Sequence, residues 1–327
     1  MSKKFRLLGL LATFAAVLVL AACGGGSGEE DTSEEGDSGS EETTEEGSGG
    51  SSDASSSAEL GETELTIPYV AWAGAIARTP LVQQVLEEVG YTVETSQVEA
   101  GAMWSSVAND DAAFMTASWL PATHQSYQEE YGNDVEVLGE FVAQAPLGMT
   151  VPSYMDVDAI EDLQGNEELG EALDWSITGI DPGAGVMQST EDAIETYGLE
   201  NWELTSSSEG AMLSELQSAV DNEEPIIVPG WQPHPMFATM DLKMLEDPEE
   251  VYGGEGDRIE AVAHTSFQED SPAAYEVMQR FTEDYNEDIE NELLASIDEG
   301  GEPEEVASQY LEDNPDLLES WTEGLGE

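Results

Sequence analysis

Apolar and polar positions follow two different periods along residues 62–327. The segment LTIPYVAW (65–72) is a short apolar run with the length of a strand, as is the later TVETSQVEA (92–100). Between them, LVQQVLEEVGY repeats its apolar residues at helical spacing, at Leu81, Val82, Val85 and Val89. The pattern therefore predicts a strand, a helix and a second strand at the start of this region.

The same succession occurs a second time. DWSITGIDPGAG (174–185) reads as a strand that enters a glycine loop, and MQSTEDAIETYG and WELTSSSEG read as a helix and a strand. The parallel continues between residues 99–119 and 209–231, each of which opens with Gly-Ala-Met, passes through a helical pattern and ends in a short apolar strand with a tryptophan. The chain is therefore predicted to contain one structural unit twice.

Strands that alternate with helices predict parallel sheets with crossover helices, and two such units predict two similar α/β lobes with a ligand cleft between them. We expect the first lobe at 62–145 and the second at 146–265, with C-terminal helices at 266–327 that return to the first lobe. Ligands of open α/β sheets bind beyond the carboxyl ends of the strands. Trp72, Trp119, Trp231 and the loop at 183–186 all fall at that edge.

The three tryptophans are the first candidate binding residues. Each of them alone is as well explained by packing within a lobe. Three indole rings at equivalent strand ends favour a common purpose, because ring faces around one point attract a cation, and quaternary ammonium groups are typical guests. Trp104 is expected in the core, and Trp175, Trp202 and Trp321 are assigned to packing.

The loop GIDPGAGVM (179–187) lies between a predicted strand and a predicted helix. Amides at a helix N-terminus can bind an anion, and Gly183 and Gly185 would allow a close approach of the backbone. The loop matches neither G-x-G-x-x-G nor a phosphate-binding Gly-Lys-Ser/Thr motif, which argues against a nucleotide. A plain tight turn remains an equal alternative for this loop taken alone.

Two of the three histidines follow a Trp-x-Pro stretch, in SWLPATH (118–124) and GWQPHPM (230–236). His124 could donate a hydrogen bond to a bound carboxylate, whereas a lone histidine such as His234 is more often structural. HExxH, paired Cys/His spacings and G-x-S-x-G are all missing from the sequence. We therefore expect no catalytic residues, no metal site and no cofactor, and predict that the chain is not an enzyme.

The N-terminus has the pattern of a secretory signal peptide. Lys3, Lys4 and Arg6 precede an apolar run that is too short for a comfortable membrane span, and LAAC at 20–23 resembles a bacterial lipobox. We predict a signal peptide at 1–22, lipidation of Cys23 and an extracytoplasmic chain held at the cell membrane by this anchor alone. Residues 23–61 are acidic and rich in Gly and Ser, which predicts a disordered, self-repelling linker.

The formal net charge of the chain is −65, with 72 acidic residues. Removal of residues 1–22 would leave four basic residues, so 4 minus 72 gives −68 for the mature chain. Such a field repels nucleic acid and anionic headgroups, and is typical of proteins that work in high salt, where self-repulsion is screened. The charge thus indicates a halophilic environment and excludes nucleic acid as a partner, but does not specify an activity.

The segments YVAW, GAMW, SWLPATH, GIDPGAGVM and GWQPHPMFATMDLKMLEDP resemble the substrate-binding lipoproteins of glycine betaine ABC importers. The resemblance covers nearly all of 62–327 and implies a two-lobed periplasmic-binding-protein fold. It implies that Trp72, Trp119 and Trp231 surround the trimethylammonium group. It also implies that the amides of Gly185 and Val186, with the side chain of His124, meet the carboxylate.

The resemblance further implies a monomer that delivers glycine betaine to a membrane permease with an ATPase subunit, for osmoprotection. The same fold for choline, carnitine or proline betaine is the alternative. An enzyme acting on a small cationic substrate and a purely structural surface protein are hypotheses from other classes. Two positions depart from the family pattern: Ala73, where relatives often carry an acidic residue, and Pro235, where they often carry an aromatic one.

Overall fold

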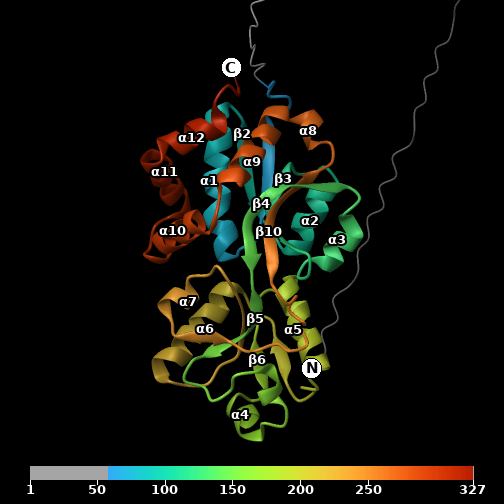
Figure 1. The fold of residues 1–327 in the computed structure, drawn as a ribbon, viewed down its shortest axis with the longest axis vertical. Helices are drawn as coiled ribbons and strands as arrows, with labels where there is room; N and C mark the ends of the chain where they lie inside the picture. The colour runs from blue at the N-terminus through green and yellow to red at the C-terminus, as the bar shows by residue number, and fades with distance from the viewer. Residues whose placement is uncertain (1–57, 327) are drawn as a thin grey trace, which may run out of the picture. The chain divides into compact units, whose positions relative to one another are not determined.

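A computed structural model describes residues 58–326 of the chain, and they form two lobes that lie one below the other in Figure 1. We call the lobe that holds the N-terminal strands lobe I and the other lobe II. The predicted signal peptide, Cys23 and most of the predicted linker lie outside the described residues. Among the described residues, no helix is long and apolar enough to cross a membrane.

Lobe I is built from the two ends of the described chain. Its strands are β1 (Glu64–Tyr69), β2 (Thr92–Gln97), β3 (Phe114–Leu120), β4 (Val135–Ala145) and β10 (Asp257–His264). Its helices are α1 (Ala73–Val89), α2 (Ala100–Ala108), α3 (Gln125–Tyr131), α8 (Phe267–Asp270), α9 (Pro272–Asp284), α10 (Glu287–Asp298), α11 (Pro303–Asp313) and α12 (Pro315–Thr322).

Lobe II is formed by the middle of the chain. Its strands are β5 (Leu147–Pro152), β6 (Ser176–Thr178), β7 (Glu203–Thr205), β8 (Val228–Trp231) and β9 (Leu242–Met244). Its helices are the 3₁₀ turn η1 (Ile160–Leu163) and α4 (Glu167–Ala172), α5 (Gly185–Thr196), α6 (Glu209–Asn222) and α7 (Met236–Thr239).

The repeated unit expected from the sequence is present in both lobes. β1-α1-β2-α2-β3 in lobe I has its counterpart in β6-α5-β7-α6-β8 in lobe II. In α1 the residues at helical spacing, Leu81, Val82 and Val85, are fully buried, and the helix ends at Gly90 in the left-handed conformation that glycine permits. The two-lobed α/β fold is therefore confirmed.

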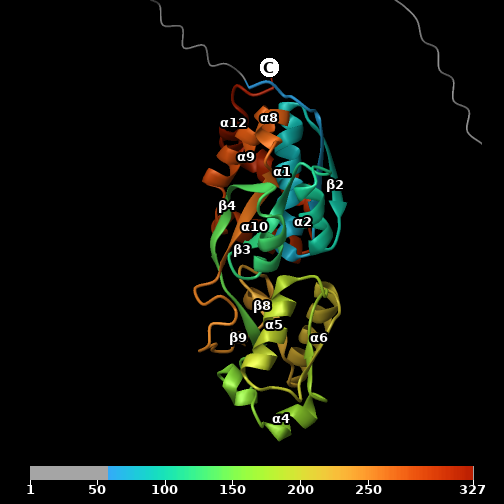
Figure 2. The same ribbon diagram turned by 90° about the vertical axis from the view of Figure 1, so that its right-hand side faces the viewer.

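The prediction of parallel sheets is right for only part of the molecule. β1 pairs parallel with β2 and β6 parallel with β7, but β3-β10-β4 and β8-β5-β9 are antiparallel. The central strand of each antiparallel sheet is one that enters from the other lobe. In Figure 1, β4 leads down to β5 in lobe II, and β10 lies beside β4 in lobe I; Figure 2 shows β4 running down towards β8 and β9. A strand that arrives from that direction runs against the strands already in the lobe, and therefore pairs antiparallel with them.

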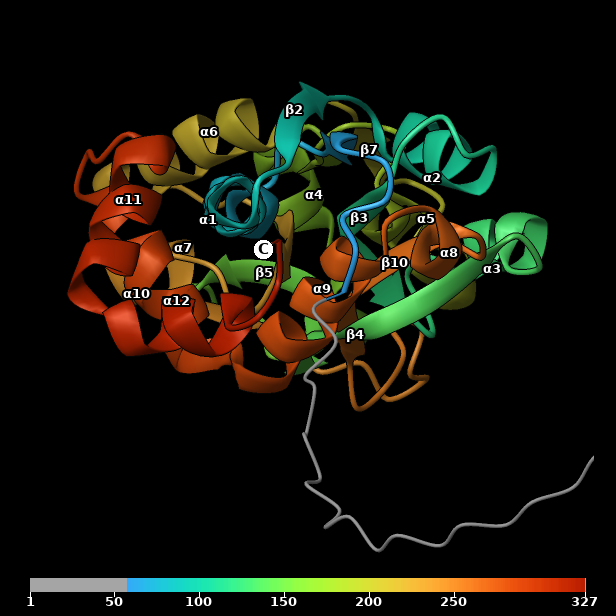
Figure 3. The same cartoon turned by 90° about the horizontal axis from the view of Figure 1, so that it is seen from above.

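One boundary of the predicted lobes is wrong for the same reason. The prediction of 146–265 for lobe II includes β10, yet β10 pairs with β3 and β4 of lobe I. Helices α10, α11 and α12 contact α1, and α9 contacts β4. Figure 3 shows α10–α12 beside α1, with α2 and α3 on the other side of β3 and β10. The other boundaries stay predictions.

Candidate ligand-binding site

Three tryptophans from three different strand ends line one small cavity. Trp72 is the N-cap of α1 just after β1, Trp119 lies near the end of β3 in lobe I, and Trp231 is the last residue of β8 in lobe II. All three side chains are buried, and the cavity between them is completed by Thr123, Leu147, Ile180, Ala184, Gly185 and Val186. The structure thus brings together five of the six predicted ligand-binding residues.

Strand pairing fixes the positions of two of these rings. Trp231 stands opposite Leu147 in the β8–β5 pair, and Leu147 is itself in the cavity wall. Trp119 stands opposite Ile259 of β10, the strand that returns from lobe II. In both Trp-x-Pro stretches the peptide bond before the proline is cis, at Leu120–Pro121 and Gln232–Pro233. The two similar sequences therefore share a local conformation as well as a place beside the cavity.

His124, the sixth predicted residue, lies next to the tryptophans and is completely buried. Its ring centroid is 5.9 Å from that of Trp72. Its Nδ1 accepts hydrogen bonds from Trp104 Nε1 at 3.2 Å and from the Trp119 amide at 3.1 Å, so the ring proton resides on Nε2. Burial lowers the pKa of His124 to about 3, which keeps the ring neutral. Nε2 is buried and has no hydrogen-bond partner among the described residues, although His124 itself is not among the residues that line the cavity.

The glycine loop provides further donors. Gly185 and Val186 are the first two residues of α5, a helix of 12 residues, and their amides cannot bond within the helix. A Cβ on Gly185 would lie 2.0 Å from the carbonyl oxygen of Thr123 in lobe I, so only glycine permits this approach. A Cβ on Gly183 would meet nothing closer than 3.9 Å, so the close approach expected there is not found.

Side chains of the two lobes are joined directly beside the cavity. The Trp72 indole donates to Asp181 Oδ2 at 3.0 Å, and the Tyr127 hydroxyl donates to the Gly183 carbonyl at 2.9 Å. Burial, followed by the charge of Asp181, raises the pKa of Tyr127, so the phenol keeps its proton. Tyr127 also stacks on Trp104, with centroids 5.9 Å apart and planes at 17°.

Sequence reasoning did not find Asp181 or Tyr127. Asp181 lies in the GIDPGAG loop, and its place there is the only signal that could have singled it out among 72 acidic residues. Trp104, expected in the core, is fully buried, but it also holds His124 in place. The described residues contain no group of three or more His, Cys, Asp or Glu arranged to hold a metal ion.

Residues 63–313 match a family model described as the substrate-binding domain of the ABC-type glycine betaine transport system, OpuAC. The chain belongs to this family. The resemblance inferred from the short motifs is thereby confirmed over most of the described residues. The family consists of substrate-binding domains of transporters, which agrees with the absence of catalytic motifs from the sequence.

Solved structures show the same fold. The lactococcal OpuAC in its closed, liganded conformation with glycine betaine is 33% identical, with a TM-score of 0.73 over 80% of this chain and 100% of that one. A choline-binding protein of an ABC transporter, in complex with choline, is 26% identical, with a TM-score of 0.74 over 80% of this chain and 93% of that one.

Among curated proteins, the glycine betaine/carnitine transport binding protein GbuC of Listeria monocytogenes is 41% identical over 161 residues, which are 49% of this chain and 53% of GbuC. The glycine betaine/proline betaine-binding periplasmic protein of Escherichia coli is 26% identical over 186 residues, 52% of this chain and 54% of that protein. The chain thus spans about half the length of the curated relatives that it matches.

Proposed function

We propose that this chain is an extracytoplasmic receptor that captures glycine betaine between its lobes and delivers it to an ABC permease with its ATPase subunit. The observation that carries the proposal is the meeting of Trp72, Trp119 and Trp231 at one cavity. Indole faces attract a methylated ammonium group by about 0.5–2 kcal/mol each, and the burial of its methyl groups adds to this.

The opposite end of the ligand would be bound by hydrogen-bond donors. The Nε2–H of His124 and the amides of Gly185 and Val186 suit a carboxylate, because they are neutral donors in a buried place and the N-terminus of α5 favours negative charge. This combination favours a betaine over choline, which has a hydroxyl in place of the carboxylate. No reaction on this chain is part of the proposal.

A titration of the intrinsic tryptophan fluorescence of the full chain in molar salt tests the proposal. Glycine betaine is expected to give a saturable change at lower concentration than choline, with carnitine and proline betaine as further ligands. Trp231→Ala should remove the response. If Trp231→Ala bound glycine betaine as well as the wild type, the assignment of the tryptophans would be wrong. If the wild type bound choline more tightly than glycine betaine, the carboxylate-binding role of His124 and α5 would be wrong.

We propose further that the chain acts as a monomer anchored through a lipid on Cys23, with the acidic segment that follows serving as a tether. The LAAC sequence at 20–23 supports this part of the proposal. Cys23→Ser should move the chain from the membrane fraction to the soluble fraction of cells that export it. Retention of Cys23→Ser in the membrane fraction would exclude this anchor.

A further inference from the structure

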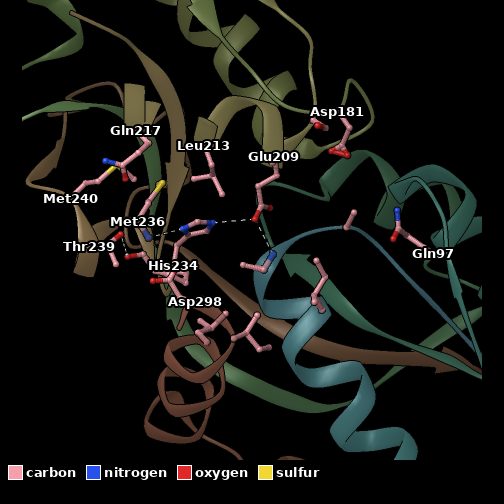
Figure 4. A pocket seen from close by; sticks show the side chains of 18 of the residues that line it. Gln97, Asp181, Glu209, Leu213, Gln217, His234, Met236, Thr239, Met240 and Asp298 are labelled. Carbon is pink, nitrogen blue, oxygen red and sulfur yellow. Dashed lines mark hydrogen bonds and ion pairs between the residues drawn. The ribbon is translucent and has the colours of Figure 1, made fainter. Parts of the chain in front are cut away.

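A carboxylate of lobe II, that of Glu209, accepts a hydrogen bond from the first amide of α1 in lobe I. Glu209 is the first residue of α6, and its side chain is buried. Its Oε1 accepts hydrogen bonds from the Ala73 amide at 3.0 Å and from His234 Nε2 at 3.2 Å, drawn as dashed lines in Figure 4. Because Ala73 and Glu209 belong to different lobes, the first of these bonds exists only while the lobes are together.

The N-terminus of α1 needs such a partner. The N-cap residue Trp72 forms no side-chain cap, and the first turn of the helix contains no acidic residue. A helix of 17 residues has a positive N-terminus with amides that find no carbonyl within the helix. Glu209 therefore supplies from the opposite lobe the acceptor that α1 lacks in its own segment.

The same carboxylate is connected to two of the cavity tryptophans. On one side, Ala73 directly follows Trp72. On the other side, His234 packs edge-on against Trp231, with ring centroids 5.0 Å apart and planes at 88°. His234 Nδ1 accepts from the Met236 amide at 3.1 Å, so the proton is on Nε2 and is donated to Glu209.

Among the described residues, no Lys or Arg forms an ion pair with Glu209, and its one ion-pair partner is His234. Glu209 lies in the wall of a cavity of about 710 Å³, which Figure 4 shows with Asp181, His234 and Asp298 around it. No Lys or Arg is among the residues that line this cavity. The hydrogen-bond donors that reach the Glu209 carboxylate within residues 58–326 are Ala73 N and His234 Nε2.

We propose that Glu209 is a positioning residue for ligand retention, and that Glu209, Ala73 and His234 together form a closure latch. When the lobes meet, the latch fixes the start of α1 and so holds Trp72 at the cavity that Trp231 also lines, which slows the release of the ligand. The inference rests on the proposed function for the identity of the ligand, but the lobe closure that it concerns can be measured without any ligand.

Two single substitutions break the latch from opposite sides. Glu209→Asp keeps the negative charge at the start of α6 but is one methylene too short to reach Ala73. Ala73→Pro removes the donated N–H at the first helical position, where proline is tolerated, and Trp72 already has the extended backbone that precedes proline well. Glu215→Asp, an exposed acid in the same helix and outside this cavity, is the matched control.

The first measurement is the rate of glycine betaine release, by stopped-flow tryptophan fluorescence of the full chain. Loss of a hydrogen bond to a charged group predicts release that is roughly tenfold faster or more in Glu209→Asp and in Ala73→Pro, with little change in the association rate. The double variant should release no faster than the faster single variant, because both remove one interaction. Glu215→Asp should release the ligand like the wild type.

The second measurement is the distance between the lobes without ligand, by single-molecule energy transfer between dyes on Glu88→Cys and Glu171→Cys in a Cys23→Ser background. The latch predicts that Glu209→Asp populates closed molecules less than Glu215→Asp does. Equal closed populations, or an unchanged release rate in Glu209→Asp, would overturn the inference. If the wild type bound no betaine at all, the proposed function would be wrong. The closed populations of Glu209→Asp and Glu215→Asp without ligand would still test the latch.

Discussion

The indole N–H of Trp72 in lobe I donates to the carboxylate of Asp181 in lobe II across 3.0 Å. Asp181 lies just before α5, which begins at Gly185, so one residue of the loop orients the ring while the amides that follow are those proposed to bind the ligand carboxylate. A carboxylate on the indole N–H also makes the ring face more electron-rich, which strengthens its attraction for a cation.

Asp181→Ala is therefore expected to weaken glycine betaine binding. A charge-assisted hydrogen bond contributes about 1.5–3 kcal/mol in a buried place, and Asp181 is only half-buried, so we expect an increase of roughly tenfold in Kd. Titration calorimetry of the full chain would measure it. Asp181→Asn, which keeps an acceptor oxygen, should lie between the wild type and Asp181→Ala.

Asp192→Asn serves as the control for this pair, because Asp192 is an exposed acid of α5 whose side chain accepts a hydrogen bond from Gln188 one turn away. It should bind as the wild type does. Equal Kd values for Asp181→Ala and Asp192→Asn would show that the bond to Trp72 has no part in binding.

The aromatic character of the cavity wall gives a second prediction. Trp231→Phe keeps a ring face towards the cavity, whereas Trp231→Leu keeps only apolar bulk. If cation–π attraction contributes about 0.5–2 kcal/mol per ring, Trp231→Leu should bind glycine betaine several-fold more weakly than Trp231→Phe. Comparable Kd values for the two variants would indicate that the site needs only apolar surface.

Much of the fold could be predicted from the sequence because helices and strands leave a local periodicity of apolar residues. The β-α-β-α-β units and the tryptophans at their strand ends follow from apolar spacing and from the recurrence of one pattern. The insertion of β5 and β10 as antiparallel central strands could not be predicted. Their pairing partners lie far away in the chain, as Ala263 of β10 and Phe114 of β3 show, and an apolar run does not reveal which strand it will meet or in which direction.

The site also has residues that could be predicted from the sequence and residues that could not. The rare residues Trp72, Trp119, Trp231 and His124 stood out because the chain has only seven tryptophans and three histidines. Asp181 and Glu209 did not stand out, since each is one of 72 acidic residues. Their roles depend on which donors face them across the cleft, and this is a property of the folded lobes.

The buried ring of His124 predicts a pH dependence of stability. Its pKa is lowered to about 3 by burial, below the value of about 6.5 in an unfolded chain. The stability contributed by the neutral ring is therefore complete above pH 6.5 and is lost as the pH falls towards 3, by about 1.4 kcal/mol per pH unit. His124→Gln should show a shallower loss of unfolding free energy between pH 6 and roughly pH 4.

Urea unfolding of the wild type and of His124→Gln between pH 6 and roughly pH 4 measures this difference in unfolding free energy. All other titrating groups are the same in the two proteins, so their contribution cancels in the comparison. Parallel pH profiles would contradict a buried neutral His124.

Betaine binding by the wild type should be nearly constant from about pH 8 to pH 5, because the Nε2–H donor is present throughout. In the fluorescence titration, His124→Gln should weaken the binding of glycine betaine more than the binding of choline.

Gly185 and Gly183 form a natural pair for testing lobe closure. A Cβ on Gly185 would lie 2.0 Å from the Thr123 carbonyl oxygen and 2.6 Å from Thr123 Cγ2, both in the opposite lobe. Backbone atoms cannot give way by this much, so Gly185→Ala should hold the lobes apart and raise the Kd for glycine betaine by roughly a hundredfold or more. The thermal unfolding of the ligand-free protein should change little, because the clash arises only between the lobes.

Gly183→Ala, two residues away in the same loop, would place its Cβ no closer than 3.9 Å to the Tyr127 hydroxyl oxygen. It adds the same methyl group without the clash, so binding within a few-fold of the wild type is expected. Calorimetry for Kd and small-angle scattering with saturating glycine betaine should separate the two variants, with Gly185→Ala remaining open. Closure of Gly185→Ala to the wild-type dimensions would show that the approach of Thr123 to α5 is not required for binding.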